Sequence, residues 1–378
     1  MVMDLNKRLE LIKRNTEEII TEEDLKYFLE NKIKLKHYIG FEVSGFIHLG
    51  TGLVCMSKIK DFQDAGVDCS IFLADWHSWI NDKLGGDLET IKQIAGGYFK
   101  EGLKASLKCV GGNVNKVKFV LGSDLYHNND RYWQTVIDVS KNTNLARILR
   151  SITIMGRKEG ETIDFAKLIY PPMQVADIFI QDLTIMHAGL DQRKAHVIAR
   201  DVAENLKFKK LKTKNQILKP VAVHHHLLLG LQKPSIWPIS KDQLKDLWTS
   251  MKMSKSMPGS AVFIHDSEEE IKDKLNKAFC PEKEIEFNPV LDWCKYLIFT
   301  NEKSKLKIER PVKFGGDIVY GSFNDLEKDF KEGKLHPADL KTGVSNFIIN
   351  LLKPIRDHFK KRNVASMREE LERIKITR

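Results

Sequence analysis

The hydrophobic pattern between residues 37 and 74 constrains the fold more than any other feature of the chain. It predicts a buried strand at His37–Phe41, an amphipathic helix at Gly52–Ala65 and a second strand at Val67–Ala74. Two strands joined by a helix pair in parallel through a right-handed crossover. Further strand patterns occur at Lys118–Leu121 and Pro220–Val223, with long helical stretches between them. We therefore predict an α/β fold with a Rossmann-like parallel sheet, whose ligands bind at the carboxyl ends of the strands.

Two short segments suit a nucleotide triphosphate at that edge of the sheet. His48-Leu49-Gly50-Thr51 lies where a strand leads into a helix, and a helix N-terminus offers unpaired N–H groups and a positive dipole end to phosphate. Lys252-Met253-Ser254-Lys255-Ser256 places two lysines three residues apart on a stretch without apolar periodicity. Together the segments predict a triphosphate held from two sides. The dinucleotide pattern Gly-x-Gly-x-x-Gly is missing, so a nicotinamide cofactor is not indicated.

The charge balance favours a polyanionic partner. The chain has 378 residues, a formal net charge of +10 and a pI near 9.1. A lysine-rich solvated surface would give the same totals, and charge alone leaves both interpretations open. The lysines cluster at residues 207–219 and 295–313, which favours RNA. Five scattered cysteines without Cys-x-x-Cys spacing and the lack of a long apolar run predict a cytoplasmic protein without a membrane span, disulfide or permanent metal.

At the two phosphate segments the chain resembles the class I aminoacyl-tRNA synthetases, whose signatures are a His-hydrophobic-Gly-His turn and a Lys-Met-Ser-Lys-Ser loop. The loop matches at every position, whereas Thr51 stands in place of the second histidine of the turn. A threonine hydroxyl can still donate to phosphate. Residues 170–178 and 189–194 make the chain similar, more narrowly, to the archaeal and eukaryotic type of tyrosyl-tRNA synthetase, and this resemblance covers nearly the whole chain.

The spacing of three polar residues gives an independent reason for tyrosine as substrate. Tyr170, Gln174 and Asp177 stand at i, i+4 and i+7, so a helix presents all three on one face. A buried Asp177 beside Tyr38 could both accept from and donate to a phenolic hydroxyl. Phenylalanine would leave such groups unpaired, and tyrosyl-tRNA synthetases are themselves the known example of this rejection, at about 10⁵-fold without editing.

The resemblance also implies a role for individual residues. It assigns catalysis to His48, Thr51, Lys252 and Lys255. It assigns ATP binding to Gly40, Gly50, Asp191, Lys252, Met253, Ser254, Lys255 and Ser256. It assigns tyrosine binding to Tyr38, Glu42, Ala74, His77, Tyr170, Gln174, Asp177 and Gln192. It assigns contacts with tRNA(Tyr) to Arg150, Arg193, Phe314, His336 and Asp339. Mg²⁺ is expected to accompany ATP, bound mainly by phosphate oxygens and water.

Pattern and resemblance together predict how the chain is divided. We expect an N-terminal helical segment at 1–36 and the catalytic domain at 37–245, with a helical insertion at 108–169 that forms a homodimer interface. The Lys-Met-Ser-Lys-Ser loop and linker would follow at 246–262, and a mostly helical anticodon-binding domain at 263–378.

Three other functions remain possible at this point. A tryptophanyl-tRNA synthetase shares the fold and both ATP motifs, but would need a wider pocket with an acceptor for the indole N–H. A small-molecule nucleotidyltransferase would not need a basic C-terminal third. A non-catalytic RNA-binding relative is suggested by Thr51, although Asp191, Gln192 and an intact lysine loop argue against decay. The run His224-His225-His226 suits a strand end near the nucleotide better than a metal site, because adjacent strand residues point to opposite faces.

Overall fold

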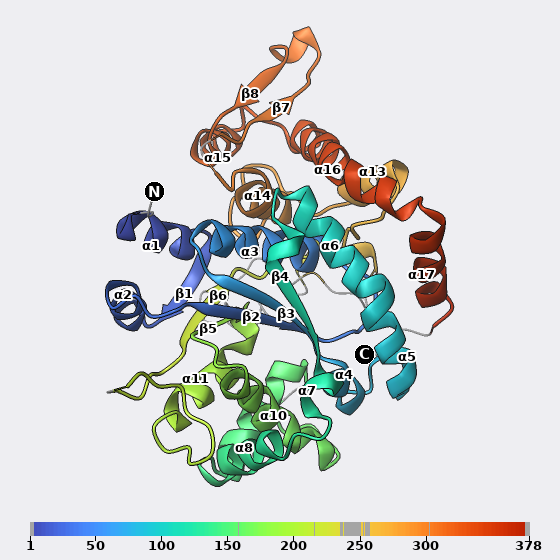
Figure 1. Cartoon of the computed structure of the whole chain (residues 1–378). Coiled ribbons are helices and arrows are strands. Elements are labelled where there is room, and N and C mark those ends of the chain that lie inside the picture. Colours follow the sequence, from blue (N-terminus) through green and yellow to red (C-terminus); the bar gives the residue numbers. More distant parts are fainter. Residues whose placement is uncertain are drawn as a thin grey trace.

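A six-stranded sheet lies at the centre of the chain (Figure 1). The computed structural model describes residues 4–157, 159–214, 216–234, 237, 251, 253, 258–301 and 303–374. Within these residues the strands of the sheet are β1 (Thr16–Ile20), β2 (Lys36–Phe41), β3 (Asp68–Leu73), β4 (Val117–Leu121), β5 (Ile185–Gly189) and β6 (Val221–His225). They lie in the order β1-β6-β5-β2-β3-β4, and every pair is parallel except β1 with β6. The predicted α/β class is confirmed.

Two strands differ from the prediction. The N-terminal segment at 1–36 was expected to be helical, but β1 interrupts it and pairs antiparallel with β6. Thr16, Ile19 and Ile20 are β-branched, and the free edge of β6 supplies the hydrogen-bonding partner that favours a strand there. β5 was not predicted, because its five residues are all buried and show no alternation of polar and apolar side chains.

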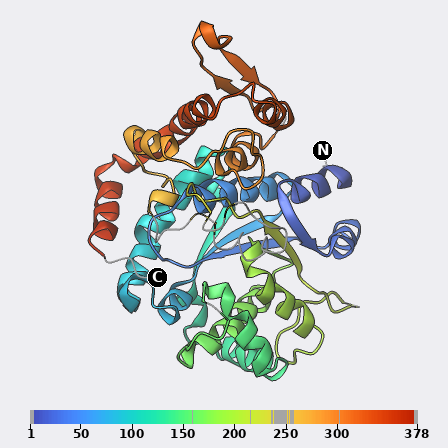
Figure 2. The same cartoon turned by 180° about the vertical axis from the view of Figure 1, so that it is seen from behind.

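Helices cover both faces of the sheet, as Figures 1 and 2 show from opposite sides. The helices before β6 are α1 (Leu5–Lys13), α2 (Glu22–Glu30), α3 (Cys55–Asp64), α4 (Asp75–Ile80), α5 (Leu88–Ile94), α6 (Lys100–Cys109), α7 (Gly122–Tyr126), α8 (Asp130–Lys141), α9 (Leu145–Ser151), α10 (Ala166–Ile180) and α11 (Arg193–Val202). α1, α3 and α6 lie on one face, and α8, α10 and α11 lie on the other. Thr21 caps α2 as its sequence predicts, because its side chain accepts a hydrogen bond from the Asp24 N–H.

The region predicted as a helical insertion contains one strand of the central sheet. β4 pairs with β3 along its length and forms the sheet edge. The helical part of residues 108–169 therefore begins after β4, with α7, α8 and α9. Among the described residues, no helix is both long and apolar enough to cross a membrane.

The C-terminal part packs on the helices that cover one face of the sheet, and it is mostly helical, as predicted. Its elements are α13 (Glu268–Asn276), α14 (Pro289–Trp293), β7 (Leu306–Ile308), β8 (Ile318–Tyr320), α15 (Phe323–Lys331), α16 (Pro337–Phe359) and α17 (Arg362–Glu372). Ser267 and Glu270 form the capping box that their spacing predicts at the start of α13. α16 lies against α6. Where the C-terminal part joins the catalytic part, the ring centroids of Tyr98 and Phe359 are 5.5 Å apart. The β7–β8 hairpin projects from the far end (Figure 1).

Candidate active site

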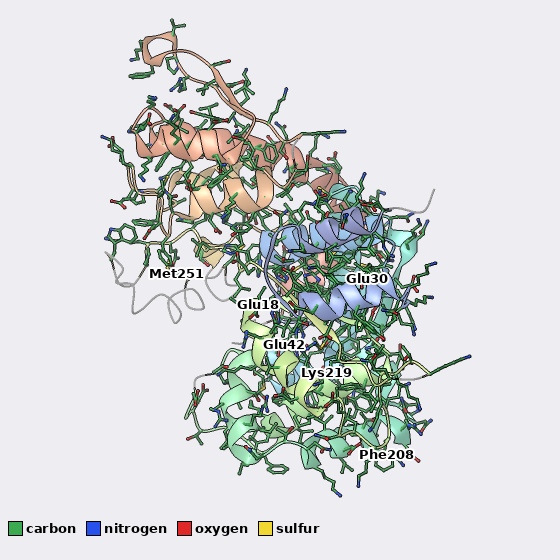
Figure 3. The ribbon with its side chains drawn as sticks, turned by 90° about the vertical axis from the view of Figure 1, so that its left-hand side faces the viewer. Glu18, Glu30, Glu42, Phe208, Lys219 and Met251 are labelled. Atoms are coloured by element: carbon green, nitrogen blue, oxygen red, sulfur yellow. The ribbon has the colours of Figure 1, made fainter. Side chains whose placement is uncertain are left out.

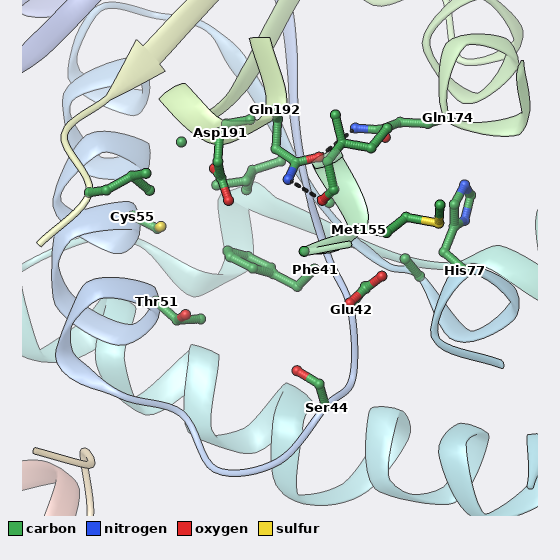
Figure 4. A pocket seen from close by; sticks show the side chains of 18 of the residues that line it. Phe41, Glu42, Ser44, Thr51, Cys55, His77, Met155, Gln174, Asp191 and Gln192 are labelled. Carbon is green, nitrogen blue, oxygen red and sulfur yellow. Dashed lines mark hydrogen bonds between the residues drawn. The ribbon is translucent and has the colours of Figure 1, made fainter. Parts of the chain in front are cut away.

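A cavity of about 720 Å³ lies at the carboxyl ends of β2, β3 and β5, where the α/β fold predicts a ligand site. It brings together residues from β2 through to Met253 (Figure 4). The predicted catalytic, ATP-binding and tyrosine-binding residues that line it are Tyr38, Gly40, Glu42, His48, Gly50, Thr51, Ala74, His77, Tyr170, Gln174, Asp177, Asp191, Gln192 and Met253. The other predicted members of the lysine loop, Lys252, Ser254, Lys255 and Ser256, lie outside the described residues.

Asp177 forms the deep end of the cavity. It lies on α10 with Tyr170 and Gln174, and all three line the cavity as their spacing predicts. Its side chain is buried, with 1% of the residue exposed, and its Oδ1 accepts a hydrogen bond of 3.1 Å from the Tyr126 hydroxyl. Burial raises the pKa of Asp177 well above its usual value, although the tyrosine hydrogen bonds act in the opposite direction. A carboxyl group in this state can both donate and accept a hydrogen bond.

Aromatic and imidazole groups surround that carboxyl group. The Tyr126 hydroxyl lies 3.3 Å from His77 Nδ1, and His77 Nε2 lies 3.8 Å from Asp177 Oδ2. Burial lowers the pKa of His77 to about 3, so its ring is neutral. Tyr38 is 3% exposed and packs edge-on against Phe72. Sequence reasoning missed Tyr126, because it lies on α7, far from Asp177 in the chain, and no local spacing links the two residues.

A second polar group lies nearer the cavity mouth. Glu42 Oε1 accepts hydrogen bonds of 2.9 Å from the Tyr170 hydroxyl and from Asn81 Nδ2. Gln174 Nε2 donates to Gln192 Oε1 at 3.3 Å, and Gln192 Nε2 donates to the Ile154 carbonyl at 2.8 Å, as the dashed lines in Figure 4 mark. Gln174 Oε1 is buried and has no hydrogen-bond partner among the described residues. These acceptors suit a cationic group of a ligand, because a buried acceptor is costly to leave unpaired.

The end of the cavity predicted to bind the nucleotide is built on backbone groups. The loop after β2 leads into a π-helical turn at Gly50–Val54, which continues as α3. The Leu49 N–H donates to the Val262 carbonyl at 3.1 Å, and the Thr51 N–H points at His48 Nδ1 at 3.3 Å. A Cβ added to Gly50 would come within 3.1 Å of the His48 ring, so glycine allows the turn to close. This helix start therefore faces the cavity with a fixed imidazole beside it.

The histidine run at the end of β6 alternates as a strand requires. His224 Nε2 lies 3.0 Å from His196 Nδ1, whereas His225 points to the opposite face, with its Nδ1 2.9 Å from His187 and its Nε2 3.5 Å from Cys55 Sγ. Burial lowers the pKa of His225 to about 4. The run therefore belongs to buried hydrogen-bond networks beside the end of the cavity predicted for the nucleotide, where Cys55 and His225 line the cavity.

The residues predicted to contact RNA lie outside this cavity. Phe314 is 60% exposed in the turn between β7 and β8, and His336 is exposed as the N-cap of α16, with Asp339 in the first turn of that helix. Arg310 joins the hairpin to the loop before α16, because its Nε donates to the Gly316 carbonyl within the hairpin at 3.0 Å and its Nη1 donates to the Lys334 carbonyl at 3.2 Å. Sequence reasoning missed this arginine.

Two arginines predicted at the acceptor stem lie on the catalytic part. Arg150 is exposed on α9, and its carbonyl accepts a hydrogen bond from Lys194. Arg193 begins α11 and forms an ion pair with Glu18 at 2.8 Å. An RNA phosphate would have to compete with Glu18 for that guanidinium.

Comparison with known proteins agrees with this geometry. The family model of class I tRNA synthetases (W and Y) matches residues 30–353. The tyrosine–tRNA ligase of Thermococcus kodakarensis is 62% identical over 378 residues, which is 100% of each chain, and that of Pyrococcus abyssi is 59% identical over the same span. The chain therefore belongs to the class I tRNA synthetases for tryptophan and tyrosine, and within them to the tyrosine–tRNA ligases.

Solved structures agree with the tyrosine branch. The crystal structure of tyrosyl-tRNA synthetase complexed with L-tyrosine from Pyrococcus horikoshii shares 58% sequence identity and a TM-score of 0.94, covering 97% of this chain and 100% of that one. A tryptophanyl-tRNA synthetase from Aeropyrum pernix K1 has a TM-score of 0.64 at 16% identity, covering 94% of this chain and 86% of that one, and shares the fold alone.

Proposed function

We propose that the chain joins L-tyrosine to tRNA(Tyr) in an ATP-dependent reaction that passes through tyrosyl-adenylate. The observation that carries the proposal is Asp177, a buried acid hydrogen-bonded to Tyr126 in the same cavity as the phosphate-binding turn at His48–Thr51. A tyrosine side chain in this cavity would meet a carboxyl group able to pair with its hydroxyl. A phenylalanine side chain would leave that group unpaired, at a cost of several kcal/mol in a buried site.

The first step needs alignment more than covalent help from the protein. The tyrosine carboxylate attacks the α-phosphorus of ATP, the bond to the bridging oxygen breaks, and pyrophosphate leaves. Glu42, Gln174 and Gln192 supply acceptors for the tyrosine ammonium group, which fixes the carboxylate relative to the nucleotide. The helix start at Gly50–Thr51 and the His48 ring face the phosphates, and Lys252 and Lys255 neutralise the charge that develops on them.

The second step transfers the amino acid to RNA. A ribose hydroxyl of the terminal adenosine attacks the carbonyl carbon of tyrosyl-adenylate, the ester to tRNA forms, and AMP leaves. The tyrosine side chain stays on Asp177 through both steps, so its selection applies to the transfer as well as to activation. Mg²⁺ enters as part of the ATP substrate complex, bound by phosphate oxygens and water.

The predicted RNA contacts give the proposal its second partner. An exposed aromatic ring at Phe314, together with His336 and Asp339 at the start of α16, suits an unstacked base whose edge carries hydrogen-bonding groups. Arg310 ties the hairpin that carries Phe314 to the loop that leads into α16. We assign this surface to the anticodon, and the exposed Arg150 to the acceptor stem.

We also propose that the enzyme is a cytoplasmic homodimer. Large apolar side chains are exposed within the predicted interface region at 108–169. They are Ile137 (59% exposed), Leu145 (62%), Leu149 (41%), Phe165 (76%) and Ile169 (36%). A second copy of the chain would cover them, which removes apolar surface from water.

Aminoacylation of total tRNA with labelled tyrosine, phenylalanine and tryptophan tests the function. We expect incorporation of tyrosine alone, together with ATP–pyrophosphate exchange that requires tyrosine. Incorporation of tryptophan would identify the alternative synthetase. Exchange without any dependence on tyrosine would favour a nucleotidyltransferase, and no exchange at all would favour a non-catalytic relative.

The RNA surface is tested by Phe314→Ala. We expect kcat/KM for tRNA in aminoacylation to fall roughly tenfold, because stacking of one base on an aromatic ring contributes about 1–3 kcal/mol. Tyrosine-dependent ATP–pyrophosphate exchange should stay unchanged, since it does not involve RNA. Val319→Ala, which removes an apolar side chain 57% exposed on β8, is the matched control and should change neither rate. An unchanged tRNA dependence in Phe314→Ala would contradict the assignment.

A further inference from the structure

Four residues from three parts of the chain meet beside the nucleotide end of the cavity. We call Glu17, His226, Asp292 and Tyr296 the clamp. His226 follows β6 and is buried, and its Nδ1 lies 2.9 Å from Glu17 Oε1 on β1. Its Nε2 lies 2.7 Å from Asp292 Oδ1 on α14, and its ring stacks on Tyr296 with centroids 3.8 Å apart. The Tyr296 hydroxyl donates to Glu17 Oε1 at 2.8 Å, which closes the clamp.

α14, the helix of the C-terminal part that carries Asp292, also binds the backbone beyond His226. Asp292 Oδ2 accepts a hydrogen bond of 2.9 Å from the Leu229 N–H, and Trp293 Nε1 donates to the Leu229 carbonyl at 2.9 Å. Both backbone groups of Leu229 are thus bound by consecutive residues of α14. The segment His226–Gly230 is therefore positioned by the C-terminal part as well as by the sheet from which it emerges.

That segment forms one wall of the cavity and holds the residues on either side of Lys252. His226, Leu227 and Leu228 line the cavity. The Met253 N–H donates to the Leu228 carbonyl at 2.9 Å, and the Gly230 N–H donates to the Met251 carbonyl at 2.7 Å. In Figure 3, Met251 and Glu18 lie where the C-terminal helices meet the rest of the chain. A continuous series of hydrogen bonds thus joins Asp292 to Met253, which itself lines the cavity.

The charges of the clamp are complementary. Burial acts to lower the pKa of His226, but the hydrogen bonds to Asp292 and Glu17 outweigh burial and raise that pKa to about 9. The hydrogen bond to His226 lowers the pKa of Glu17 to about 2, against the effect of burial. The imidazolium thus lies between two carboxylates, an arrangement in which charge-assisted hydrogen bonds are strong. Removing one carboxylate would leave a buried cation with one partner.

We propose that Asp292 is a positioning residue for ATP: through His226 and Leu229 it fixes the wall of the nucleotide end that carries Leu228 and Met253. The inference rests on the proposed ATP-dependent function and adds to it a residue of the C-terminal part. Asp292 acts on ATP alone, because the tyrosine end is held by hydrogen bonds among Glu42, Asn81, Tyr126, Tyr170 and Asp177, none of which involves α14.

The experiment measures KM for ATP and for tyrosine in the exchange reaction with the full-length Asp292→Ala and Asp292→Asn variants. Alanine removes the acceptor of the Leu229 N–H and one partner of His226. We expect the ATP KM to rise roughly tenfold and the tyrosine KM to change by less than about twofold. Asparagine keeps an acceptor for the Leu229 N–H but removes the charge, so its ATP KM should lie between wild type and alanine. If the alanine variant does not fold, the asparagine variant carries the test.

Glu101→Gln is the matched control. Glu101 on α6 lies 3.4 Å from His358 Nε2 on α16, so this pair also joins a histidine and a carboxylate across the two parts of the chain, but away from the cavity. We expect it to leave both KM values unchanged. The proposal is overturned if the Asp292 variants keep a wild-type ATP KM, if the ATP and tyrosine KM values rise together, or if Glu101→Gln raises the ATP KM equally.

Failure of the proposed function has a different outcome. It would appear as wild-type enzyme without tyrosine-dependent exchange. Equilibrium dialysis with labelled ATP then tests the clamp directly, and Asp292→Ala should still bind ATP roughly tenfold more weakly than wild type. Equal ATP binding by the two proteins would overturn the proposed role of Asp292, independently of the proposed function.

Discussion

The two ends of the active-site cavity differ in how burial acts on their charged groups. At the end proposed for tyrosine, burial raises the pKa of Asp177 and lowers that of His77 to about 3, so it opposes charge on both groups. At the end proposed for the nucleotide, the wall is fixed by a clamp of one cation and two carboxylates, and a helix start lines the cavity. Selection of a side chain depends on the cost of unpaired neutral groups, whereas phosphate transfer depends on fixed charges and dipoles.

The two ends also differ in which parts of the chain build them. β2, α4, α7 and α10 supply the tyrosine end, and all belong to the catalytic sheet and its covering helices. The nucleotide end needs residues 226–230, which are held by α14 of the C-terminal part. We therefore expect that a change in the C-terminal part can alter ATP binding without altering the selection of tyrosine.

The largest expected effect is at the tyrosine end. Asp177→Ala removes the partner of the substrate hydroxyl and of the Tyr126 hydroxyl, so we expect kcat/KM for tyrosine in ATP–pyrophosphate exchange to fall roughly 10³-fold. Asp177→Asn keeps one acceptor and one donor and should lose much less. Circular dichroism checks that both variants fold. A wild-type kcat/KM for tyrosine in the alanine variant would contradict the assignment of Asp177 to the tyrosine end.

The next effect is at the nucleotide end. Lys255→Ala should slow tyrosine-dependent exchange by roughly 10²-fold, because it removes a charge-assisted contact to the phosphates in the transition state. Tyrosine binding, measured by equilibrium dialysis without ATP, should stay unchanged. Lys219→Ala removes a lysine that pairs with Glu204 elsewhere and serves as control. A large loss of tyrosine affinity in Lys255→Ala would show that the two ends are not independent.

The smallest expected effect concerns stability and pH. The folded-state pKa of His226, about 9, is higher than its unfolded value of 6.5, so its contribution is complete below pH 6.5 and is lost as pH rises through 9. The shift corresponds to at most about 3 kcal/mol of unfolding free energy. Urea unfolding at pH 6.5 and 9 should show this loss in wild type and a smaller loss in Asp292→Asn. His77 is neutral when folded, but its unfolded form loses a proton as pH rises through 6.5, so His77 adds a small gain in stability that is the same in both proteins. Equal losses in the two proteins would contradict the charged clamp.

Local patterns in the sequence were sufficient for much of the fold and for one face of the site. The strand–helix–strand unit at residues 37–74 and the capping box at Ser267 depend on neighbours in the chain, and the structure contains both. The same holds for Asp177, since residues four and seven apart on α10 share a face whatever surrounds the helix. β1 was predicted incorrectly because its partner β6 lies about 200 residues away.

The sequence by itself determined the class of fold, the turn at His48–Thr51 and the polar face of α10, because short-range periodicity and turn geometry control them. Only the tertiary structure decided that Tyr126 reaches Asp177, that Glu42 joins Tyr170 and Asn81, and that Asp292 holds His226 and Leu229. These contacts join residues 39 to 128 positions apart, so they form only when the elements that carry them pack together in the folded chain. Burial in that packed state then sets the pKa values of the site.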